Sequence, residues 1–224
     1  MIDIYGVTKS YRTQNSEVLA VDNVHFGVRS GDFIMILGRS GCGKSTLLGM
    51  LAGLIRPSAG AIRFNGQEIW TNSDANMAGF RAKEIGFVFQ FSGLISTLTA
   101  IENVMLPTLF LPNGTDCRMK AHALLERVWM LHRADAYPMT LSSGEMKRVA
   151  IARALVNDPA LIIAYEPTGD LDVDTEYEIM ELFRELNNEG TTIIMVTHNP
   201  ELVPYATRTY RMDHGKVVNT TEAL

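Results

Sequence analysis

The sequence has few cysteines, no excess of basic residues and no uninterrupted apolar run long enough to cross a membrane. Its two cysteines, Cys42 and Cys117, are too few for a disulfide framework or a cysteine-rich metal cluster, and they suit a reducing compartment. The net charge of −5 argues against a broad nucleic-acid-binding surface, because binding to phosphate backbones needs an excess of lysine and arginine. We therefore expect no nucleic acid among the partners.

The first residues include the acidic Asp3 and contain no basic segment followed by an apolar core. We therefore expect no secretory signal and a cytoplasmic location. With 224 residues, 46% of them hydrophobic, the chain can bury a large core as one large domain or two small lobes.

Phe91 to Pro112 is the segment most similar to a membrane span, but Glu102, Asn103 and Pro107 interrupt it, and we reject a spanning helix. Two interpretations of this segment stay open. Its apolar residues form a surface that receives a helix from a partner, or they belong to an ordinary core.

A phosphate loop follows the apolar run 33–37, with the sequence Gly38-Arg39-Ser40-Gly41-Cys42-Gly43-Lys44-Ser45. Its glycines permit backbone conformations closed to other residues and leave room for a phosphate group. The loop N–H groups and the positive end of the helix that follows both favour an anion. Lys44 can bridge the β- and γ-phosphates and the Ser45 hydroxyl can coordinate Mg²⁺, so the pattern predicts binding of a nucleoside triphosphate.

Hydrophobic periodicity predicts an α/β fold with a mainly parallel sheet, an antiparallel β subdomain and an inserted helical subdomain. Alternation between Ile2 and Val28 favours antiparallel strands, and Asn65-Gly66 is typical of a hairpin turn. Compact apolar runs separated by a helical segment favour buried parallel strands. The expected elements are a turn at 31–32, a helix over 46–54, a hairpin over 61–69, strands over 33–37, 85–89, 161–164 and 192–196, mainly helical structure over about 101–156, a helix over 175–188 and a hairpin over 207–219.

A second motif, Leu141-Ser142-Ser143-Gly144-Glu145, precedes an apolar helical pattern. Ser142 and Glu145 have the spacing of a capping box, and capping alone would explain them. What adds information is the position of this segment between the phosphate loop and a second apolar strand that ends with Tyr165-Glu166.

In their order along the chain, these motifs resemble the ATP-binding cassette (ABC) family of transporter ATPases, which share a P-loop NTPase core. The resemblance covers nearly the whole chain. Within the family, the runs 85–90 and 98–104 look most like the lipoprotein-release, macrolide-export and cell-division type. The matching motifs are the phosphate loop (38–45), the Q-loop glutamine Gln90, the signature segment (141–145), Glu166, the D-loop (169–172) and the switch histidine His198.

The resemblance implies a single nucleotide-binding domain over residues 1–224. Residues 1–90 and 157–224 would form the ATPase core with its β subdomain, and about 91–156 the helical subdomain. Two such domains, in a homodimer or heterodimer, would close head to tail with ATP between the phosphate loop of one and the signature segment of the other. A separate integral membrane permease would dock a short cytoplasmic helix near 91–112, which places the chain peripherally on the inner face of the membrane.

The resemblance also implies roles for individual residues. Glu166 would polarise the attacking water, His198 would contact the γ-phosphate, and Gln90 would sense the metal and the γ-phosphate. Ser45 and Gln90 are the implied Mg²⁺ ligands. ATP would contact Tyr11, Gly38, Arg39, Ser40, Gly41, Cys42, Gly43, Lys44, Ser45 and Thr46 of one chain, and Ser142, Ser143, Gly144 and Glu145 of the other. For Tyr11 the alternatives are stacking on adenine and a half-buried core position.

The chain departs from the family pattern at Tyr165, where the family has an aspartate that accepts hydrogen bonds from the magnesium's water shell. A neutral phenol cannot replace that charge, and the loss is worth about 1.5–3 kcal/mol. One rival hypothesis is therefore a hydrolytically weak, ATP-operated binding module; the alternative is partial compensation by Asp170. Ser143 and Glu145 replace the usual glycine and glutamine of the signature. Another rival, a cassette ATPase acting on DNA or ribosomes, predicts tandem cassettes, coiled coils or a basic face, and the sequence has none of these.

Overall fold

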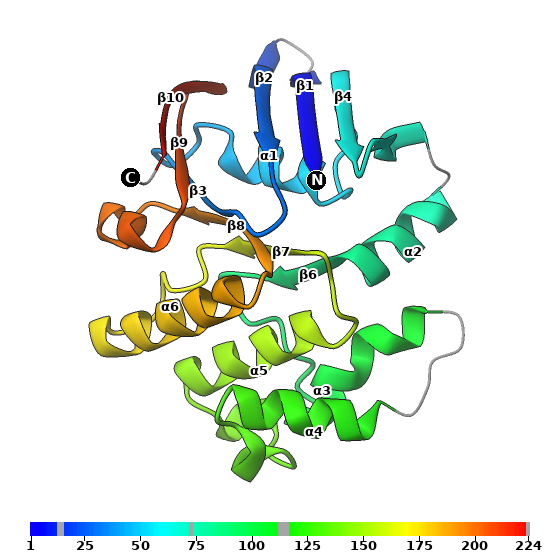
Figure 1. Ribbon diagram of the computed structural model, residues 1–224, viewed down its shortest axis with the longest axis vertical. Coiled ribbons are helices and arrows are strands. Elements are labelled where there is room, and N and C mark those ends of the chain that lie inside the picture. The colour runs from blue at the N-terminus through cyan, green and yellow to red at the C-terminus, as the bar shows by residue number, and fades with distance from the viewer. Residues whose placement is uncertain (13–15, 72–73, 112–116, 223–224) are drawn as a thin grey trace. The chain divides into compact units, whose positions relative to one another are not determined.

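The computed structural model describes residues 1–12, 16–71, 74–111 and 117–222. It contains two compact units, one formed by Met1–Met77 with Gly190–Leu224 and the other by Ala78–Glu189 (Figure 1). We call them the first and the second unit. The division into an ATPase core and a helical subdomain over about 91–156 groups the chain differently and stays a prediction.

An antiparallel sheet in the first unit contains β1 (Ile2–Arg12), β2 (Glu17–Val28), β4 (Ala59–Phe64) and β5 (Gln67–Glu68) in the order β2-β1-β4-β5. Figure 1 shows β1, β2 and β4 side by side. Ile2, Ile4 and Val24 are buried, as the alternation predicts. Asn65 and Gly66 have φ angles of 49° and 81°, so the predicted hairpin turn is confirmed.

The other strands of the first unit are β3 (Phe33–Leu37), β8 (Thr192–Thr197), β9 (Arg208–Asp213) and β10 (Lys216–Glu222), in the order β10-β9-β3-β8. β3 runs parallel to both β8 and β9. Its residues 33–36 are fully buried, which explains their continuous apolar sequence. The terminal hairpin of β9 and β10 turns at His214 and Gly215, as predicted. A 3₁₀ helix, η5 (Pro200–Tyr205), lies between β8 and β9.

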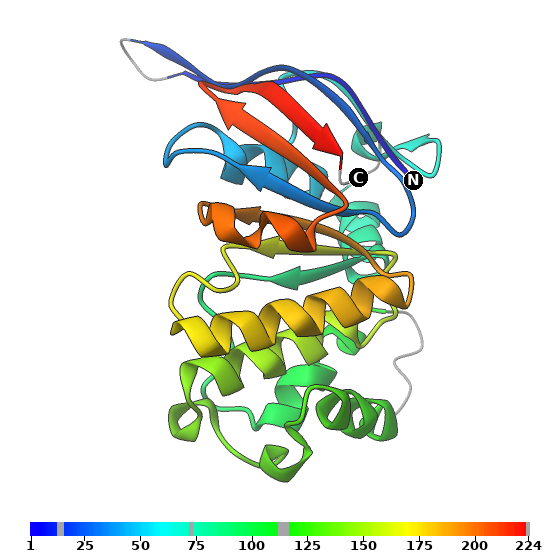
Figure 2. The ribbon, with the colours of Figure 1, turned by 60° about the vertical axis from the view of Figure 1, so that its left-hand side comes forward.

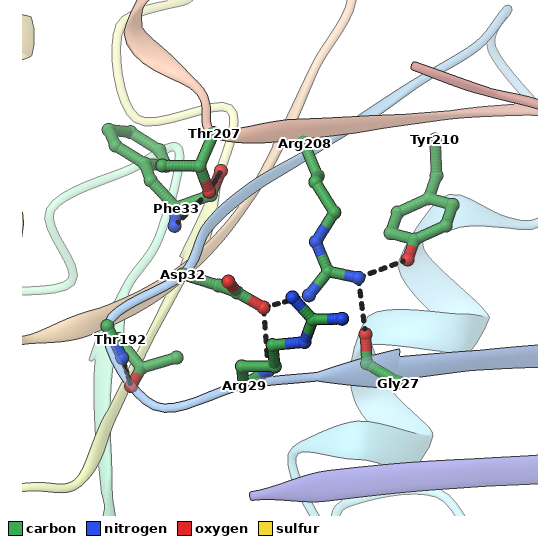
Figure 3. Close-up of polar contacts among 9 residues, drawn as sticks. Gly27, Arg29, Asp32, Phe33, Thr192, Thr207, Arg208 and Tyr210 are labelled. Carbon is green, nitrogen blue, oxygen red and sulfur yellow. Dashed lines mark hydrogen bonds and ion pairs between the residues drawn. The ribbon is translucent and has the colours of Figure 1, made fainter. Parts of the chain in front are cut away.

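Polar contacts anchor the start of β3, the strand that leads into the phosphate loop (Figure 3). The guanidinium of Arg208 forms an ion pair with Asp32, and its Nη1 donates to the Tyr210 hydroxyl at 3.2 Å. The backbone N–H of Phe33 donates to Thr207 Oγ1 at 2.9 Å, and that hydroxyl donates to the Phe33 carbonyl oxygen at 3.1 Å. These contacts connect the beginning of β3, and Asp32 directly before it, with β9 and with Thr207 directly before β9.

The helix after the phosphate loop, α1 (Lys44–Leu51), is shorter than the predicted helix over 46–54. The predicted end at Leu54 is wrong, because the helix ends at Leu51, and the helix begins at Lys44, before the predicted start. Gly53 takes a φ of 66°, and the N–H of Leu54 bonds to the Gly49 carbonyl at 2.8 Å. This left-handed glycine ends the helix before Leu54, although the apolar periodicity continues.

The second unit contains two parallel strands, β6 (Ile85–Val88) and β7 (Leu161–Tyr165), paired from Ile85 with Leu161 onward. β6 packs closely on helix α5 (Ser143–Leu155), as shown by a Cβ built on Gly86, which would lie 2.4 Å from the Ala154 carbonyl oxygen. Figure 2 shows α5 together with α3 (Ala100–Met105) in this unit. Its other elements are α3 (Ala100–Met105), η2 (Leu106–Phe110), α4 (Arg118–Arg127), η3 (Leu131–Arg133), η4 (Pro138–Thr140), α5 (Ser143–Leu155) and α6 (Val173–Asn188).

The helix α2 (Asp74–Glu84) and the 3₁₀ helix η1 (Ile69–Thr71) were not predicted from the sequence. α2 contains Gly79, and Met77 and Phe80 are its only large apolar residues, so it carries little helical periodicity. In the segment from Phe91 onward, Ile101 and Val104 are buried, whereas Phe91 and Phe110 are 75% and 68% exposed. The segment is therefore core at Ile101 and Val104 and surface at Phe91 and Phe110, and the docking of a partner helix on this surface stays a prediction; Pro112 lies outside the described residues. No helix within the described ranges has the length and apolar character needed to span a membrane.

Candidate nucleotide-binding site

The phosphate loop lies between β3 and α1 in the first unit. Gly41 and Gly43 have φ angles of 78° and 105°, and Gly43 is the N-cap residue of α1. Lys44 is only 6% exposed, and its ammonium donates to the carbonyl oxygens of Gly38 at 2.7 Å and Arg39 at 2.9 Å. The charged end of Lys44 therefore lies within the loop at the start of a helix, where the backbone also favours an anion.

Neighbouring strands leave no room for side chains on one side of the loop. A Cβ on Gly43 would lie 2.1 Å from the Ala20 carbonyl oxygen, and one on Gly38 would lie 2.5 Å from that of Met212. Ser40 and Ser45, by contrast, are exposed. The loop thus has a packed side and an open side with hydroxyl groups, an arrangement that fits a triphosphate and a hydrated metal ion.

His198 follows β8 directly and lies at the same sheet edge as the phosphate loop. The register pairs Leu37 with Thr197, so Gly38 and His198 continue from neighbouring strand ends. Both residues line an open cleft of about 770 Å³, together with Arg39. Ligands of open α/β sheets collect at the carboxyl ends of parallel strands, and the fold brings His198 to that edge.

Tyr11 lies on β1 and is 42% exposed. It pairs with Val18 on β2, the strand whose Ala20 carbonyl contacts the phosphate loop at Gly43. The Lys9 ammonium lies 5.3 Å from the Tyr11 ring centroid. The ring is therefore accessible rather than enclosed in a core, although its stacking on adenine stays a prediction.

The signature segment starts α5 in the second unit, and its predicted capping box is confirmed. Ser142 is the N-cap: its Oγ accepts from the Glu145 N–H at 3.2 Å, and its own N–H donates to Glu145 Oε2 at 2.8 Å. Arg133 Nε lies 3.4 Å from Glu145 Oε1. The Ser142 N–H, with help from the Ser142 hydroxyl and from Arg133, lowers the pKa of Glu145.

The two middle residues of the signature segment differ in exposure. Gly144 is buried, and a Cβ there would lie 2.7 Å from Thr175 Cγ2 on α6, whereas Ser143 is exposed at the first position of the helix. Asp172 caps α6 by accepting from the Thr175 N–H at 3.0 Å. Because Gly144 has no side chain, α5 and α6 can approach each other, and Ser143 lies on the exposed side of the α5 N-terminus.

Gln90 and Glu166 lie close to the D-loop in the second unit. A Cβ on Gly169 would lie 3.7 Å from Gln90 Nε2 and 3.8 Å from Glu166 Cβ. Glu166 is 7% exposed and has a φ of 43°, a conformation that costs a residue with a side chain some backbone strain. The structure thus brings together Gln90 and Glu166, two residues far apart in sequence.

Tyr165 is the last residue of β7 and is half-buried beside Glu166. Asp170, the carboxylate that could compensate for the missing aspartate, lies 3.5 Å from the Lys147 ammonium. That carboxylate is already paired with a buried cation, so it is not a simple substitute for a carboxylate at position 165.

Lys147 and Arg133 belong to this region but were not predicted from the sequence. Lys147 stands within an apolar helical pattern, and this is a detectable signal, because a lysine on the buried side of a helix needs partners. The contact of Arg133 with Glu145 cannot be predicted from the neighbouring sequence, because it depends on how the chain turns between the two residues. The roles predicted for Gln90, Glu166 and His198 stay predictions.

Comparison with known proteins adds independent findings. The family model described as ABC transporter matches residues 21–169. A macrolide export ATP-binding/permease protein, MacB of Chlorobaculum tepidum, is 44% identical over 219 residues, which cover 98% of this chain and 34% of that protein. The lipoprotein-releasing system ATP-binding protein LolD of Geobacter metallireducens is 41% identical over 220 residues, covering 97% of this chain and 98% of that protein. The chain thus spans about a third of the length of its MacB relative and nearly all of its LolD relative.

Solved structures that resemble this chain are also ATP-binding cassettes. A dimeric post-hydrolysis state of the ATP-binding cassette MJ0796, bound to ADP and Pi, has a TM-score of 0.91 at 35% sequence identity and matches 99% of this chain and 98% of that one. The predicted fold class, a P-loop NTPase α/β fold, is confirmed by this likeness. The family model, the relatives and the solved structures agree with the motifs in the sequence, and the chain belongs to the ABC transporter family as an ATP-binding cassette.

Proposed function

We propose that this chain is the ATP-binding subunit of an ABC transporter or mechanotransmission complex and that it hydrolyses ATP while paired head to tail with a second cassette, of like or unlike sequence. A separate membrane permease would respond to closing and opening of the cassette pair.

The observation that supports ATP binding most directly is the geometry of the phosphate loop. Gly43 caps α1 with a φ of 105°, and the Lys44 ammonium bonds to two carbonyl oxygens of the same loop. A glycine-rich loop that leads into a helix and holds a lysine ammonium favours the binding of phosphate groups. Such a loop suits the triphosphate tail of a nucleotide, with Lys44 on the β- and γ-phosphates.

Six predicted residues outside the phosphate loop have specific roles in this proposal. Glu166 accepts a proton from the attacking water, and His198 and Gln90 orient groups around the γ-phosphate. Ser142 and Gly144, at the N-terminus of α5, donate to the γ-phosphate of the nucleotide held by the second cassette. Tyr11 stacks on the adenine ring.

The residues present also fit a magnesium ion in part. Ser45 has an exposed hydroxyl at the start of α1, and Gln90 offers an amide oxygen; both are oxygen donors of the kind that Mg²⁺ prefers. Bound Mg²⁺ would neutralise charge on the phosphate oxygens. Tyr165 offers no carboxylate for the water shell of the ion.

An apolar groove in the second unit supports a protein partner. It has a volume of about 490 Å³ and includes Phe87, Phe89, Leu106 and Phe110. Arg153 also lines it and donates to the carbonyl oxygens of Ser92 and Gly93, each at 2.7 Å. We propose this groove as the docking site for the cytoplasmic helix of the permease, because apolar grooves with polar rims receive amphipathic helices.

Calorimetric titration of the full chain with ATP, with and without Mg²⁺, tests the proposal. We expect uptake of ATP and a loss of affinity of at least about tenfold in Lys44→Ala, because a charge-assisted contact is lost. Lys120→Met is a matched control, because it removes a lysine of an exposed ion pair with Asp158 on the second unit. Failure of the natural chain to bind ATP would overturn the proposal.

A second candidate function rests on Tyr165. A cassette with a weakened metal site would bind ATP and close with its partner but hydrolyse slowly, and it would act as an ATP-operated binding module beside an active cassette. The pairing of Asp170 with Lys147 supports this candidate, because the D-loop carboxylate that could compensate for Tyr165 already pairs with a buried ammonium.

A further inference from the structure

Lys147 on α5 is a fully buried cation. Its side chain is 0% exposed, and the only other buried lysine in the described ranges is Lys44 of the phosphate loop, at 6%. Lysine is almost never fully buried unless its charge is paired and its hydrogen bonds are satisfied. The position of Lys147 therefore requires specific partners.

Three acceptors surround the Lys147 ammonium, which matches its three N–H donors. It donates to the backbone carbonyl oxygens of Phe89 at 3.1 Å and Gln90 at 2.5 Å. Asp170 Oδ1 lies 3.5 Å away. The first two acceptors follow β6 and the third follows β7, so one side chain connects the Q-loop with the D-loop.

The same connection reaches the residues proposed to act on ATP. Gln90 supplies one of the carbonyls, and the built Cβ of Gly169, next to Asp170, lies 3.7 Å from the Gln90 amide nitrogen and 3.8 Å from Glu166 Cβ. The N–H of Gly169 donates to the Glu166 carbonyl at 3.3 Å. A shift of the D-loop or of the Gln90 backbone would therefore move the Gln90 or Glu166 side chain.

Burial makes this cation costly, which argues that its contacts matter. Burial lowers the pKa of Lys147, and the charge of Asp170 acts in the opposite direction. A methionine or leucine would fill the same helix face without this cost, because an apolar side chain needs no partners. What an apolar residue could not do is hold two carbonyl groups and a carboxylate at once.

We propose that Lys147 is a positioning residue for ATP hydrolysis, because its ammonium ties the backbone of Gln90 to the carboxylate of Asp170 and so fixes the Q-loop and D-loop relative to each other. This inference depends on the ATPase activity proposed above. The competing interpretation is that Lys147 is only a satisfied buried charge with no effect on catalysis.

The kinetic test uses the full chain in four versions: natural, Lys147→Met, Asp170→Asn and the double variant. We expect Lys147→Met to bind ATP within about threefold of the natural chain and to lose about ten- to a hundredfold in single-turnover rate, because small misplacements of reacting groups have effects of that size. The rate of Asp170→Asn should fall less. The rate of the double variant should fall no further than that of Lys147→Met, since both changes remove the same contact.

Lys120→Met is the matched control, because Lys120 also pairs with an aspartate, Asp158, on the second unit. It should keep the rate of the natural chain. A Lys147→Met variant with a rate within about twofold of the natural chain, or rate losses that multiply in the double variant, would overturn the proposal.

Hydrogen exchange on the nucleotide-free chain tests whether the Lys147 contacts fix the D-loop, and it does not depend on ATPase activity. The amides of Gly169 and Leu171 donate to the carbonyls of Glu166 and Thr168 in the D-loop. We expect their exchange to accelerate at least about tenfold in Lys147→Met and not in Lys120→Met, at temperatures where both variants are folded. Unchanged exchange would overturn the proposal that Lys147 fixes the D-loop. Failure of the natural chain to bind ATP would overturn the proposed function but would not affect the exchange result.

Discussion

Arg208 on β9 forms an ion pair with Asp32, the residue that precedes β3, across a sequence separation of 176 residues (Figure 3). Their side chains are 12% and 15% exposed. Asp32 Oδ2 also accepts from the Arg29 N–H at 2.6 Å, which closes the turn before β3. One carboxylate thus sets both the turn and the start of the strand that carries the phosphate loop.

We expect Arg208→Met to lower the free energy of unfolding by at most about 3–5 kcal/mol, the cost of breaking a fully buried pair, because it leaves the largely buried carboxylate of Asp32 without the guanidinium of Arg208. Denaturant unfolding followed by circular dichroism measures this loss. Asp32→Asn combined with Arg208→Met should recover part of it, since the pair is then removed rather than broken.

Arg184→Met is the control, because Arg184 pairs with Glu181 on the surface, with side chains 55% and 39% exposed. It should change stability by less than about 1 kcal/mol. Equal effects of Arg184→Met and Arg208→Met would contradict the role of the buried pair.

Tyr165→Asp tests whether the missing carboxylate limits turnover. The substitution restores a negative charge at the end of β7, and we expect Mg²⁺-dependent ATP hydrolysis to rise about ten- to a hundredfold, the equivalent of one charge-assisted contact. Steady-state ATPase of the full chain, or of the chain assembled with its permease, measures the change.

Tyr177→Asp is the matched control, because it adds the same charge on an exposed part of α6, where Tyr177 is 43% exposed. Its turnover should equal that of the natural chain. If the natural chain hydrolyses ATP as fast as Tyr165→Asp, the candidate function as a weak, ATP-operated module is wrong.

Features that depend on neighbours in the sequence were predictable. The left-handed glycines of the phosphate loop, the Asn65-Gly66 turn and the capping box of Ser142 with Glu145 all follow from residues a few positions apart. Their geometry is decided by local backbone sterics and local hydrogen bonds, which a sequence states directly. The parallel strands were predictable for a related reason, because continuous burial leaves a continuous apolar run.

Features that depend on distant residues were not predictable in the same way. The contacts of Lys147 with Gln90 and Asp170 connect segments that follow different strands, and no local pattern indicates which carbonyl a buried lysine will meet. The end of α1 was misjudged because apolar periodicity continues to Leu54 while Gly53 turns the backbone. The roles of Glu166 and His198 rest on the family resemblance, since their local geometry alone suits several chemistries.

Tyr11→Ala tests stacking on adenine. Stacking of a base on an aromatic ring is worth about 1–3 kcal/mol, so we expect a loss of ATP affinity of about five- to a hundredfold and a much smaller loss in Tyr11→Trp. Tyr5→Ala is the matched control, because Tyr5 lies on the same strand with a similar exposure of 50%. If Tyr11→Ala lowers stability but leaves ATP affinity unchanged, Tyr11 is a packing residue.

Glu145→Gln separates the charge of the signature glutamate from its capping role, because glutamine also serves at this position of a capping box. The Ser142 N–H lowers the pKa of Glu145 below its ordinary value of 4.5. A carboxyl group whose pKa falls on folding stabilises the folded state above its unfolded pKa, and this contribution is lost as the pH falls through the folded pKa. We therefore expect the natural chain to exceed Glu145→Gln in stability by about 0.3–1 kcal/mol near neutral pH, and this difference to disappear in acid.

Urea unfolding of both chains at about pH 7 and about pH 3.5 measures the difference, since only the natural chain loses the charge in this window. Ser142→Ala is the comparison variant: it removes the hydroxyl cap, worth about 1 kcal/mol, but keeps the N–H that lowers the pKa of Glu145. Its destabilisation should therefore persist at both pH values. A difference between the natural chain and Glu145→Gln that grows as the pH falls would mean that the Glu145 charge destabilises α5, and the capping account of this glutamate would be wrong.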